Sequence, residues 1–264
     1  MSTYDEALSP RQVGEGRFRI TSDPAYHLWR DSFVHGGYQL AIATRALAAA
    51  TGRPSPATLT AHYLDRVVPG ELDVIVEVIR AGKHATAVAS IEQDGRLRTR
   101  LTATFADQAS AVGLDHVEVS PPDAPAFDDG DLRHGTTATS YHHFVPSWRQ
   151  GSSGFLDRAP SGSTEVVARY RRRDGDLIDA AGLALLSDIL ISPAFEGGLA
   201  PFGWIPTLEL TSHFHRPEAV HAEVIVRLTM PVATRGYVTE DVDIWSADGK
   251  ELLLTGRQLA LVRT

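Results

Sequence analysis

Part of this chain occurs twice. The segment Leu59-Thr60-Ala61-His62-Tyr63 returns as Leu210-Thr211-Ser212-His213-Phe214, and the pair Asp94-Gly95 returns as Asp248-Gly249. Both landmarks recur after about 150 residues, and a nearly constant spacing indicates a duplicated structural unit. Each Asp-Gly pair lies between strand-like runs, a pattern typical of a tight hairpin turn. The fold must therefore accommodate two related halves.

The two halves show the same predicted order of short strands, one long helix and four strands. In the first half, short strands at 18–20 and 25–29 precede a helix from Gly37 to Ala50 that Gly52 and Pro54 end. Strands are then predicted at 58–67, 71–80, 85–93 and 97–105. In the second half, the predicted strands are 139–145, 164–172, 204–215, 222–230, 237–245 and 252–262, with a helix capped by Asp176 that runs to Ser192 before Pro193. This pattern predicts an α+β fold of two repeats, in each of which an antiparallel sheet wraps around a central helix.

A segment of different composition separates the halves. Residues 107–138 are rich in Pro, Ala and Asp, as at Pro121-Pro122 and Asp128-Asp129. Such a composition is typical of a linker. We expect an N-terminal repeat at 1–107, a linker at 108–138 and a C-terminal repeat at 139–264.

The overall composition excludes several classes of function. The 264 residues carry a net charge of -8, which disfavours nucleic acid and anionic membranes as partners. The absence of cysteine excludes disulfides, thiolate zinc sites and a cysteine nucleophile. No apolar run approaches the length of a membrane span, and residues 1–19 contain no apolar signal segment, so we expect a cytoplasmic protein.

Two polar residues occupy positions predicted to be apolar. Asp188 lies among leucines and isoleucines of the second predicted helix, where an unpaired charge is costly. Gln258 shares a strand face with an apolar set: Leu252, Leu254, Ala260 and Val262. A carboxylate whose pKa burial can raise and an amide that both donates and accepts could together hold a water molecule. Asp188 could instead face solvent or make a structural hydrogen bond.

Other candidate site residues carry weaker signals. Simple alternation places Thr207 on the solvent side of its strand, but Pro206 permits a bulge that would turn it inward, and Thr211 is the alternative. Gly36-Gly37 at a helix start leaves backbone N–H groups free for a phosphate or an oxyanion, although a plain tight turn explains the pair equally well.

Metal, phosphate and serine-nucleophile sites are poorly supported. His213, His215 and Glu209 share a strand face without a further ligand, and the adjacent His142-His143 face opposite sides of a strand. Arg169, Arg171 and Arg173 share one face, Arg172 faces the other, and a solvated edge explains them better than a phosphate-binding site. Gly151-Ser152-Ser153-Gly154 lacks the spacing of a Gly-x-Ser-x-Gly elbow. We expect no metal and no cofactor.

The chain resembles the TesB-like acyl-CoA thioesterase II family of double hotdog proteins, from Phe33 to Arg263. The resemblance is carried by four patterns: Phe33-Val34-His35-Gly36-Gly37, Leu186-Ser187-Asp188, Thr207 upstream of Phe214-His215-Arg216-Pro217, and Gln258. It implies a catalytic set of Asp188, Thr207 and Gln258 that activates water to hydrolyse an acyl-CoA, with His35, Gly36, Gly37 and Tyr38 contacting the substrate.

Two positions depart from the family pattern. Tyr38 stands where the better-known members have Gln, and Glu209-Leu210 replaces an acidic-histidine pair, which leaves the threonine register open. The resemblance implies an acyl-CoA substrate, and exposed sheet edges favour a homo-oligomer. Two alternatives stay open: an acyl-CoA hydratase or dehydratase that would use His35 or His213, and a non-catalytic acyl-CoA-binding protein.

Overall fold

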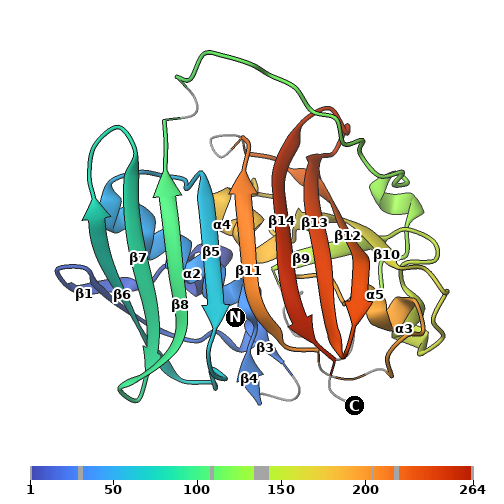
Figure 1. Ribbon diagram of the computed structural model, residues 1–264, viewed down its shortest axis with the longest axis horizontal. Helices are drawn as coiled ribbons and strands as arrows, with labels where there is room; N and C mark the ends of the chain where they lie inside the picture. The colour runs from blue at the N-terminus through green and yellow to red at the C-terminus, as the bar shows by residue number, and fades with distance from the viewer. Residues whose placement is uncertain are drawn as a thin grey trace.

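The chain forms one continuous antiparallel sheet of twelve strands, with two central helices packed together on one of its faces (Figure 1). The computed structural model describes residues 2–28, 32–107, 110–133, 143–201, 203, 205–216 and 220–262. The strand order is β1-β2-β6-β7-β8-β5-β11-β14-β13-β12-β10-β9, so the second half mirrors the first. Both halves thus contribute to a single sheet, and the predicted double hotdog architecture is confirmed.

The bounds of the elements are as follows. The first half contains β1 (Arg11–Gly14), β2 (Arg17–Thr21), β5 (Thr58–Tyr63), β6 (Glu71–Arg80), β7 (Ala85–Gln93), β8 (Arg96–Phe105) and a small ribbon of β3 (His27–Leu28) with β4 (Phe33–Val34). The second half contains β9 (Phe144–Trp148), β10 (Glu165–Arg172), β11 (Thr207–Phe214), β12 (Glu223–Thr234), β13 (Tyr237–Ser246) and β14 (Leu252–Leu261). The helices are α1 (Tyr4–Leu8), α2 (Gly36–Thr51), α3 (Gly154–Asp157), α4 (Ala180–Leu186) and α5 (Pro193–Glu196).

The two repeats join where β5 pairs with β11. These strands contain the recurring sequence segments, and Thr60 is directly opposite Thr211 in the register. The hydroxyl oxygens of these two threonines are 3.0 Å apart, although 151 residues separate them in the chain. Because each residue of the pair is the counterpart of the other, the local two-fold axis of the duplication passes through this seam.

Helix α2 forms as its sequence predicts. It begins at Gly36 and ends at Thr51, and Gly52 follows in the left-handed conformation with φ of 68°. Most of its residues up to Leu47 are buried because the helix packs against α4 and against strands β6, β7 and β8. The predicted bounds of 37–50 differ from the observed ones by one residue at each end.

The second predicted helix is wrong in length. The structure replaces the single helix from Asp176 to Ser192 with the short helices α4 and α5. Asp179, not Asp176, caps α4 by accepting a hydrogen bond from the Gly182 N–H at 2.9 Å. Pro193 is the first residue of α5 instead of a residue beyond a helix end.

The apolar run explains why the sequence pattern overestimated this helix. Residues 189–190 are buried although they are not helical, so a buried irregular segment carries the same apolar signal as a helix. Ser187 donates its hydroxyl to the Ala184 carbonyl at 2.8 Å, a local bond that competes with helix continuation. Asp188 therefore lies in the turn after α4 and not within a helix.

The strand predictions hold best where alternation is clear. The bounds of β6 and β7 match the predicted ones, whereas β1 was missed because all four of its residues are exposed and show no alternation. Leu252 faces away from the helices, opposite to the prediction, because the β13–β14 register shifts between Ile244 and Trp245. Several predictions fall partly on residues outside the described part of the chain: Trp29, the predicted strand 139–145 as far as His142, Trp204, Pro217 and Arg263.

Residues 120–127 lie against the face of the second repeat's sheet that is turned away from the helices, and Figure 1 shows the preceding part of the segment arching over one end of the sheet. Arg169 donates to the Ala124 carbonyl at 3.1 Å, and Arg227 donates to the Ser120 carbonyl at 3.1 Å. The Arg171 guanidinium stacks 3.9 Å from the centre of the Phe127 ring. Arg169 and Arg171 thus anchor this segment, which the solvated-edge interpretation did not foresee. Among the described residues, no helix combines the length and apolarity needed to cross a membrane.

Helix α1 closes the start of α4. The ring of Tyr4 is fully buried, packs edge-on against Phe144, and has its hydroxyl 3.1 Å from the Asp179 carboxylate. Arg45 of α2 forms an ion pair with the same carboxylate at 2.8 Å. This contact joins the N-terminal residues to both central helices.

We expect Tyr4→Ala to lower the free energy of unfolding by about 3–5 kcal/mol, because it removes a large aromatic side chain from a closed site. Denaturant unfolding monitored by circular dichroism measures this. Tyr237→Ala is the matched control, since Tyr237 is 45% exposed and should cost less than about 1 kcal/mol. Equal losses for both variants would contradict the packing role of Tyr4.

Candidate active site

Asp188 is placed at the start of α2 by the turn that follows α4. Its carboxylate accepts a hydrogen bond from the Gly37 backbone N–H. A Cβ atom at Gly36 would lie 2.4 Å from the Asp188 Oδ2 atom, which is closer than atoms can approach. The glycine at 36 therefore makes room for the carboxylate, and the positive end of the α2 dipole faces its negative charge.

Burial sets the protonation of Asp188. Desolvation, followed by repulsion from the Glu240 carboxylate, raises the pKa of Asp188 to about 7, although the hydrogen bonds from Gly37 and Thr207 lower it. A carboxylate with a pKa near the working pH is ionised in a large share of molecules and still basic enough to accept a proton. The group is therefore suited to act as a general base.

Thr207 reaches the same place through a β-bulge. The register between β11 and β14 shifts between Thr207 and Glu209, so Thr207 turns toward the helices despite its position in the alternation. Its Oγ1 atom is 3.5 Å from the Asp188 Oδ1 atom and 3.2 Å from the Gln258 Oε1 atom. The bulge that Pro206 permits thus brings Thr207 to the group.

Gln258 completes the group from the neighbouring strand. It is 6% exposed on β14 and pairs across the sheet with Leu210 on one side and Glu240 on the other. Its Nε2 amide donates to the Glu240 carboxylate, which leaves its Oε1 atom directed at Thr207. Asp188, Thr207 and Gln258 thus meet although they come from three separate elements.

Two further side chains border this group with polar atoms that have no partner in the described residues. His35, the N-cap residue of α2, is buried, and its ring interacts with the backbone carbonyl of Asp188 while Nδ1 is unpaired. Desolvation lowers the pKa of His35 to about 4, so the ring is neutral at pH 7. The buried hydroxyl of Tyr63 is also unpaired, and the charges of Asp188 and Glu209 act on it.

Two residues considered from the sequence lie apart from this group. The Tyr38 ring is fully buried and stacks on Tyr26 at 4.7 Å, with its hydroxyl 3.4 Å from the Asp23 backbone N–H. Thr211 contacts Thr60 at the seam between the repeats. The substrate-binding role of Tyr38 stays a prediction. The described part of the chain contains no cluster of three or more His, Asp or Glu side chains that could hold a metal ion.

Sequence reasoning missed Glu240, although a signal for it was present. Alternation along 237–245 places Glu240 between Val238 and Val242 on one face, and the structure buries all three. This is the same argument that singled out Gln258: one polar residue on an otherwise apolar strand face.

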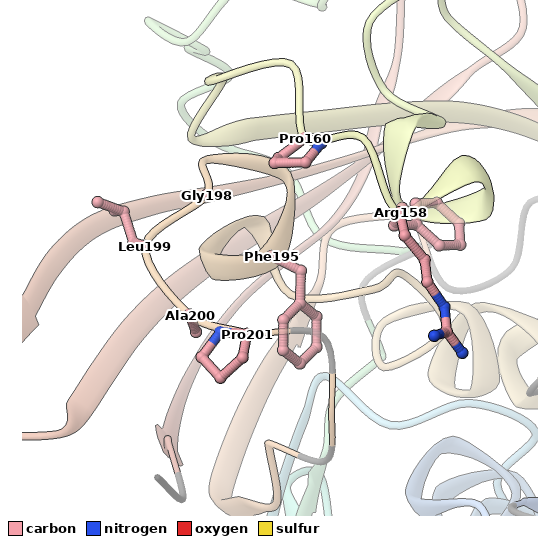
Figure 2. A pocket seen from close by; sticks show the side chains of 8 residues that line it. Arg158, Pro160, Phe195, Gly198, Leu199, Ala200 and Pro201 are labelled. Atoms are coloured by element: carbon pink, nitrogen blue, oxygen red, sulfur yellow. The ribbon is translucent and has the colours of Figure 1, made fainter.

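A hollow of about 350 Å³ lies between α3 and α5 (Figure 2). Phe155, Phe195 and Leu199 are among its lining residues, together with Arg158, Pro160, Gly198, Ala200 and Pro201. One side of α5 packs Ala194 against the sheet while Phe195 lines the hollow.

The raised pKa of Asp188 predicts a stability effect. Because the folded state binds this proton more tightly than the unfolded state does, stability decreases as the pH rises from about 4 through 7. Asp188→Asn removes this partly buried charge and should raise the free energy of unfolding at pH 8 by about 2 kcal/mol, with a smaller difference at pH 4.

Denaturant unfolding at both pH values measures this, and carboxyl NMR should show one group that titrates near pH 7 and disappears in the variant. Asp176→Asn, at an exposed aspartate, is the control and should leave stability nearly unchanged. An Asp188→Asn variant that is no more stable at pH 8 than at pH 4, relative to the parent protein, would contradict the assignment.

Comparisons with solved structures agree with this architecture. A putative thioesterase II from Thermobifida fusca superposes with a TM-score of 0.86 at 22% identity, covering 100% of this chain and 98% of that one. A hot dog fold protein of unknown function from Alicyclobacillus acidocaldarius gives 0.86 at 20% identity, with 98% and 97% covered. An acyl-CoA thioesterase II from Mycobacterium marinum gives 0.74 at 18% identity, with 98% and 96% covered. These likenesses show the fold.

Family comparison goes further than the fold. No curated protein matches the sequence significantly. The acyl-CoA thioesterase N-terminal domain matches residues 27–106, and the acyl-CoA thioesterase C-terminal domain matches residues 117–262. Together these matches cover most of the chain and both repeats. The chain therefore belongs to the acyl-CoA thioesterase family.

Proposed function

We propose that this protein hydrolyses an acyl-CoA thioester by direct attack of a water molecule held by Asp188, Thr207 and Gln258. The observation that carries the proposal is their convergence: two hydrogen-bond distances of 3.2 and 3.5 Å join Thr207 to Gln258 and to Asp188. A carboxylate with a pKa of about 7 stands beside a hydroxyl and an amide oxygen, which together can fix both protons of a water.

The reaction follows from these roles. Asp188 accepts one water proton while the Gln258 Oε1 atom accepts a hydrogen bond from the other, so the water oxygen attacks the thioester carbonyl carbon. The tetrahedral intermediate carries a negative charge near the positive end of α2. Its C–S bond then breaks, and the departing CoA sulfur takes the proton back from Asp188, releasing free acid and CoA.

The hydration alternative has one observation in its favour. His35 lies next to Asp188, and a neutral imidazole could act as a base on an enoyl-CoA. His213 is exposed on β11 and turned away from this site, so only His35 could serve. An assay of water addition to an enoyl-CoA separates the two reactions. The addition is measured as a loss of the ultraviolet absorbance of the enoyl-CoA. Tight acyl-CoA binding without any product would instead favour the non-catalytic alternative.

Cellular context is also part of the proposal. We infer a cytoplasmic enzyme of acyl-CoA and lipid metabolism, acting on acyl-CoA as its partner molecule and assembling as a homo-oligomer through its sheet edges. Fractionation and light scattering of the purified protein measure the location and the assembly.

Asp188→Asn should reduce the rate of CoA release by at least about 1,000-fold, because it removes the general base and leaves the shape of the side chain. A thiol reagent measures free CoA from short, medium, long and aromatic acyl-CoA substrates, and the protein itself adds no thiol because it has no cysteine. Asp176→Asn should keep the parent rate. Retained turnover in Asp188→Asn would rule out the proposed role.

Gly36→Ala should reduce kcat by about 100-fold, because the new methyl group would displace the Asp188 carboxylate from its position 2.4 Å away. Gly113→Ala is the matched control, since a Cβ there meets no atom within 4 Å. Circular dichroism checks that both variants fold. A Gly36→Ala variant with the parent kcat would show that the carboxylate position is not critical.

A further inference from the structure

Glu240 is a buried carboxylate whose side chain belongs to the active site but touches no reacting atom. It is 1% exposed on β13 and lies directly opposite Gln258 of β14 in the sheet register. No cation pairs with it in the described portion of the chain. A charge in such surroundings is costly unless donors satisfy it.

Two donors satisfy the Glu240 carboxylate. The Nε2 amide of Gln258 donates to Oε2, and the Ser192 hydroxyl donates to Oε1. The Ser192 oxygen in turn accepts from the Ala194 backbone N–H at 3.2 Å, as the N-cap of α5. Each oxygen of Glu240 is thus held by a group whose own direction is set by the backbone or by the sheet.

This arrangement determines which end of the Gln258 amide faces the reaction. An ionised carboxylate only accepts hydrogen bonds, so it binds the NH2 end of an amide and turns the carbonyl end away. In Gln258 the carbonyl end then points at Thr207, 3.2 Å from its hydroxyl. Without Glu240, the amide could rotate by half a turn and present its NH2 group instead.

The direction of the amide matters for the attacking water. A carbonyl oxygen accepts one water proton while Asp188 accepts the other, and the lone pair of the water is free to attack. An NH2 group would donate to that lone pair and hold the water in an unproductive orientation. We propose that Glu240 is a positioning residue of this site: it holds the Gln258 amide with its oxygen toward Thr207 and the nucleophilic water. The inference rests on the function proposed above.

The charge of Glu240 gives a second, independent readout. Its repulsion contributes to the raised pKa of Asp188, second only to burial. The other titratable groups next to Asp188 are His35, the N-cap residue of α2, and Tyr63 on β5, on which the charge of Glu209 on β11 also acts. Glu240 itself is more easily protonated than usual because burial raises its pKa. Removal of its charge should therefore make Asp188 a weaker base.

The experiment compares Glu240→Gln with the parent full-length protein over pH 5 to 9, with octanoyl-CoA as substrate. We expect kcat to fall by about 10- to 100-fold with little change in KM, because the amide loses its fixed direction. The acid limb of the kcat/KM profile should move to lower pH, because the pKa of Asp188 falls. If Glu240 were a purely structural residue, its replacement would not shift the pH profile, and it would not lower kcat while leaving KM unchanged.

Asp241→Asn is the matched control. Asp241 is the next residue of β13, faces away from the helices and pairs with Arg257 at 2.8 Å, so its loss removes the same charge without touching the site. It should leave the parent pH profile unchanged. An equal shift in both variants, or no shift and no loss of kcat in Glu240→Gln, would overturn the inference.

A double-mutant cycle tests whether Glu240 acts through Gln258. If it does, Gln258→Ala combined with Glu240→Gln should be no slower than Gln258→Ala alone. Rate losses that multiply in the double variant would contradict positioning.

The two proposals can be rejected separately. Retained turnover in Asp188→Asn would reject the hydrolytic role of Asp188. Lost turnover in Asp188→Asn, together with parent-like kinetics in Glu240→Gln, would reject only the role of Glu240. Circular dichroism of each variant confirms the fold, and Glu240→Gln preserves side-chain volume.

Discussion

The pairing of β5 with β11 is the constraint on which the rest of the structure depends. It joins the sheets of two repeats into one and makes Thr60 the direct neighbour of Thr211. Because the sheet is continuous across this seam, the central helices of both repeats pack against each other instead of facing solvent. The packing of α2 against α4 brings the turn after α4 to the first residues of α2. Asp188 and Gly36 meet as a consequence of strand pairing elsewhere in the molecule.

The site that results is electrostatically unusual because, among the described residues, no cation pairs with its two carboxylates, Asp188 and Glu240. Asp188 receives the Gly37 backbone N–H and the Thr207 hydroxyl, and Glu240 receives one hydroxyl and one amide hydrogen. These donors stabilise the charges only in part, and the remaining desolvation keeps both pKa values above their ordinary range. Such a balance is destabilising for the fold and useful for proton transfer.

Duplication does not give two equal sites. The start of α4 corresponds by symmetry to the start of α2, but there Asp179 caps the helix and forms an ion pair with Arg45. Tyr4 of α1 fills the adjoining space, and a Cβ at Gly182 would lie 2.7 Å from its hydroxyl. The second helix start is thus packed and paired, whereas the first has unpaired polar atoms at His35 and Tyr63. The proposed chemistry therefore belongs to only one of the two related helix starts.

The hydrophobic periodicity of the sequence and its glycine and proline stops were sufficient to predict the repeat, the architecture, α2 and the inward position of Gln258. These features are local, since hydrophobic alternation and a glycine stop act through neighbouring residues. The end of α4, the direction of Thr207 and the partners of Glu240 were not determined in this way. The apolar run up to Ile191 is compatible with a helix or a buried turn, and in the structure α4 ends at Leu186 and a separate helix α5 begins at Pro193. Likewise, the bulge at Thr207 and the amide direction of Gln258 arise from contacts between β11, β13 and β14. Sequence alone determined which residues must be inside, and tertiary structure decided which of them meet, because the meeting distances depend on strand register between segments far apart in the chain.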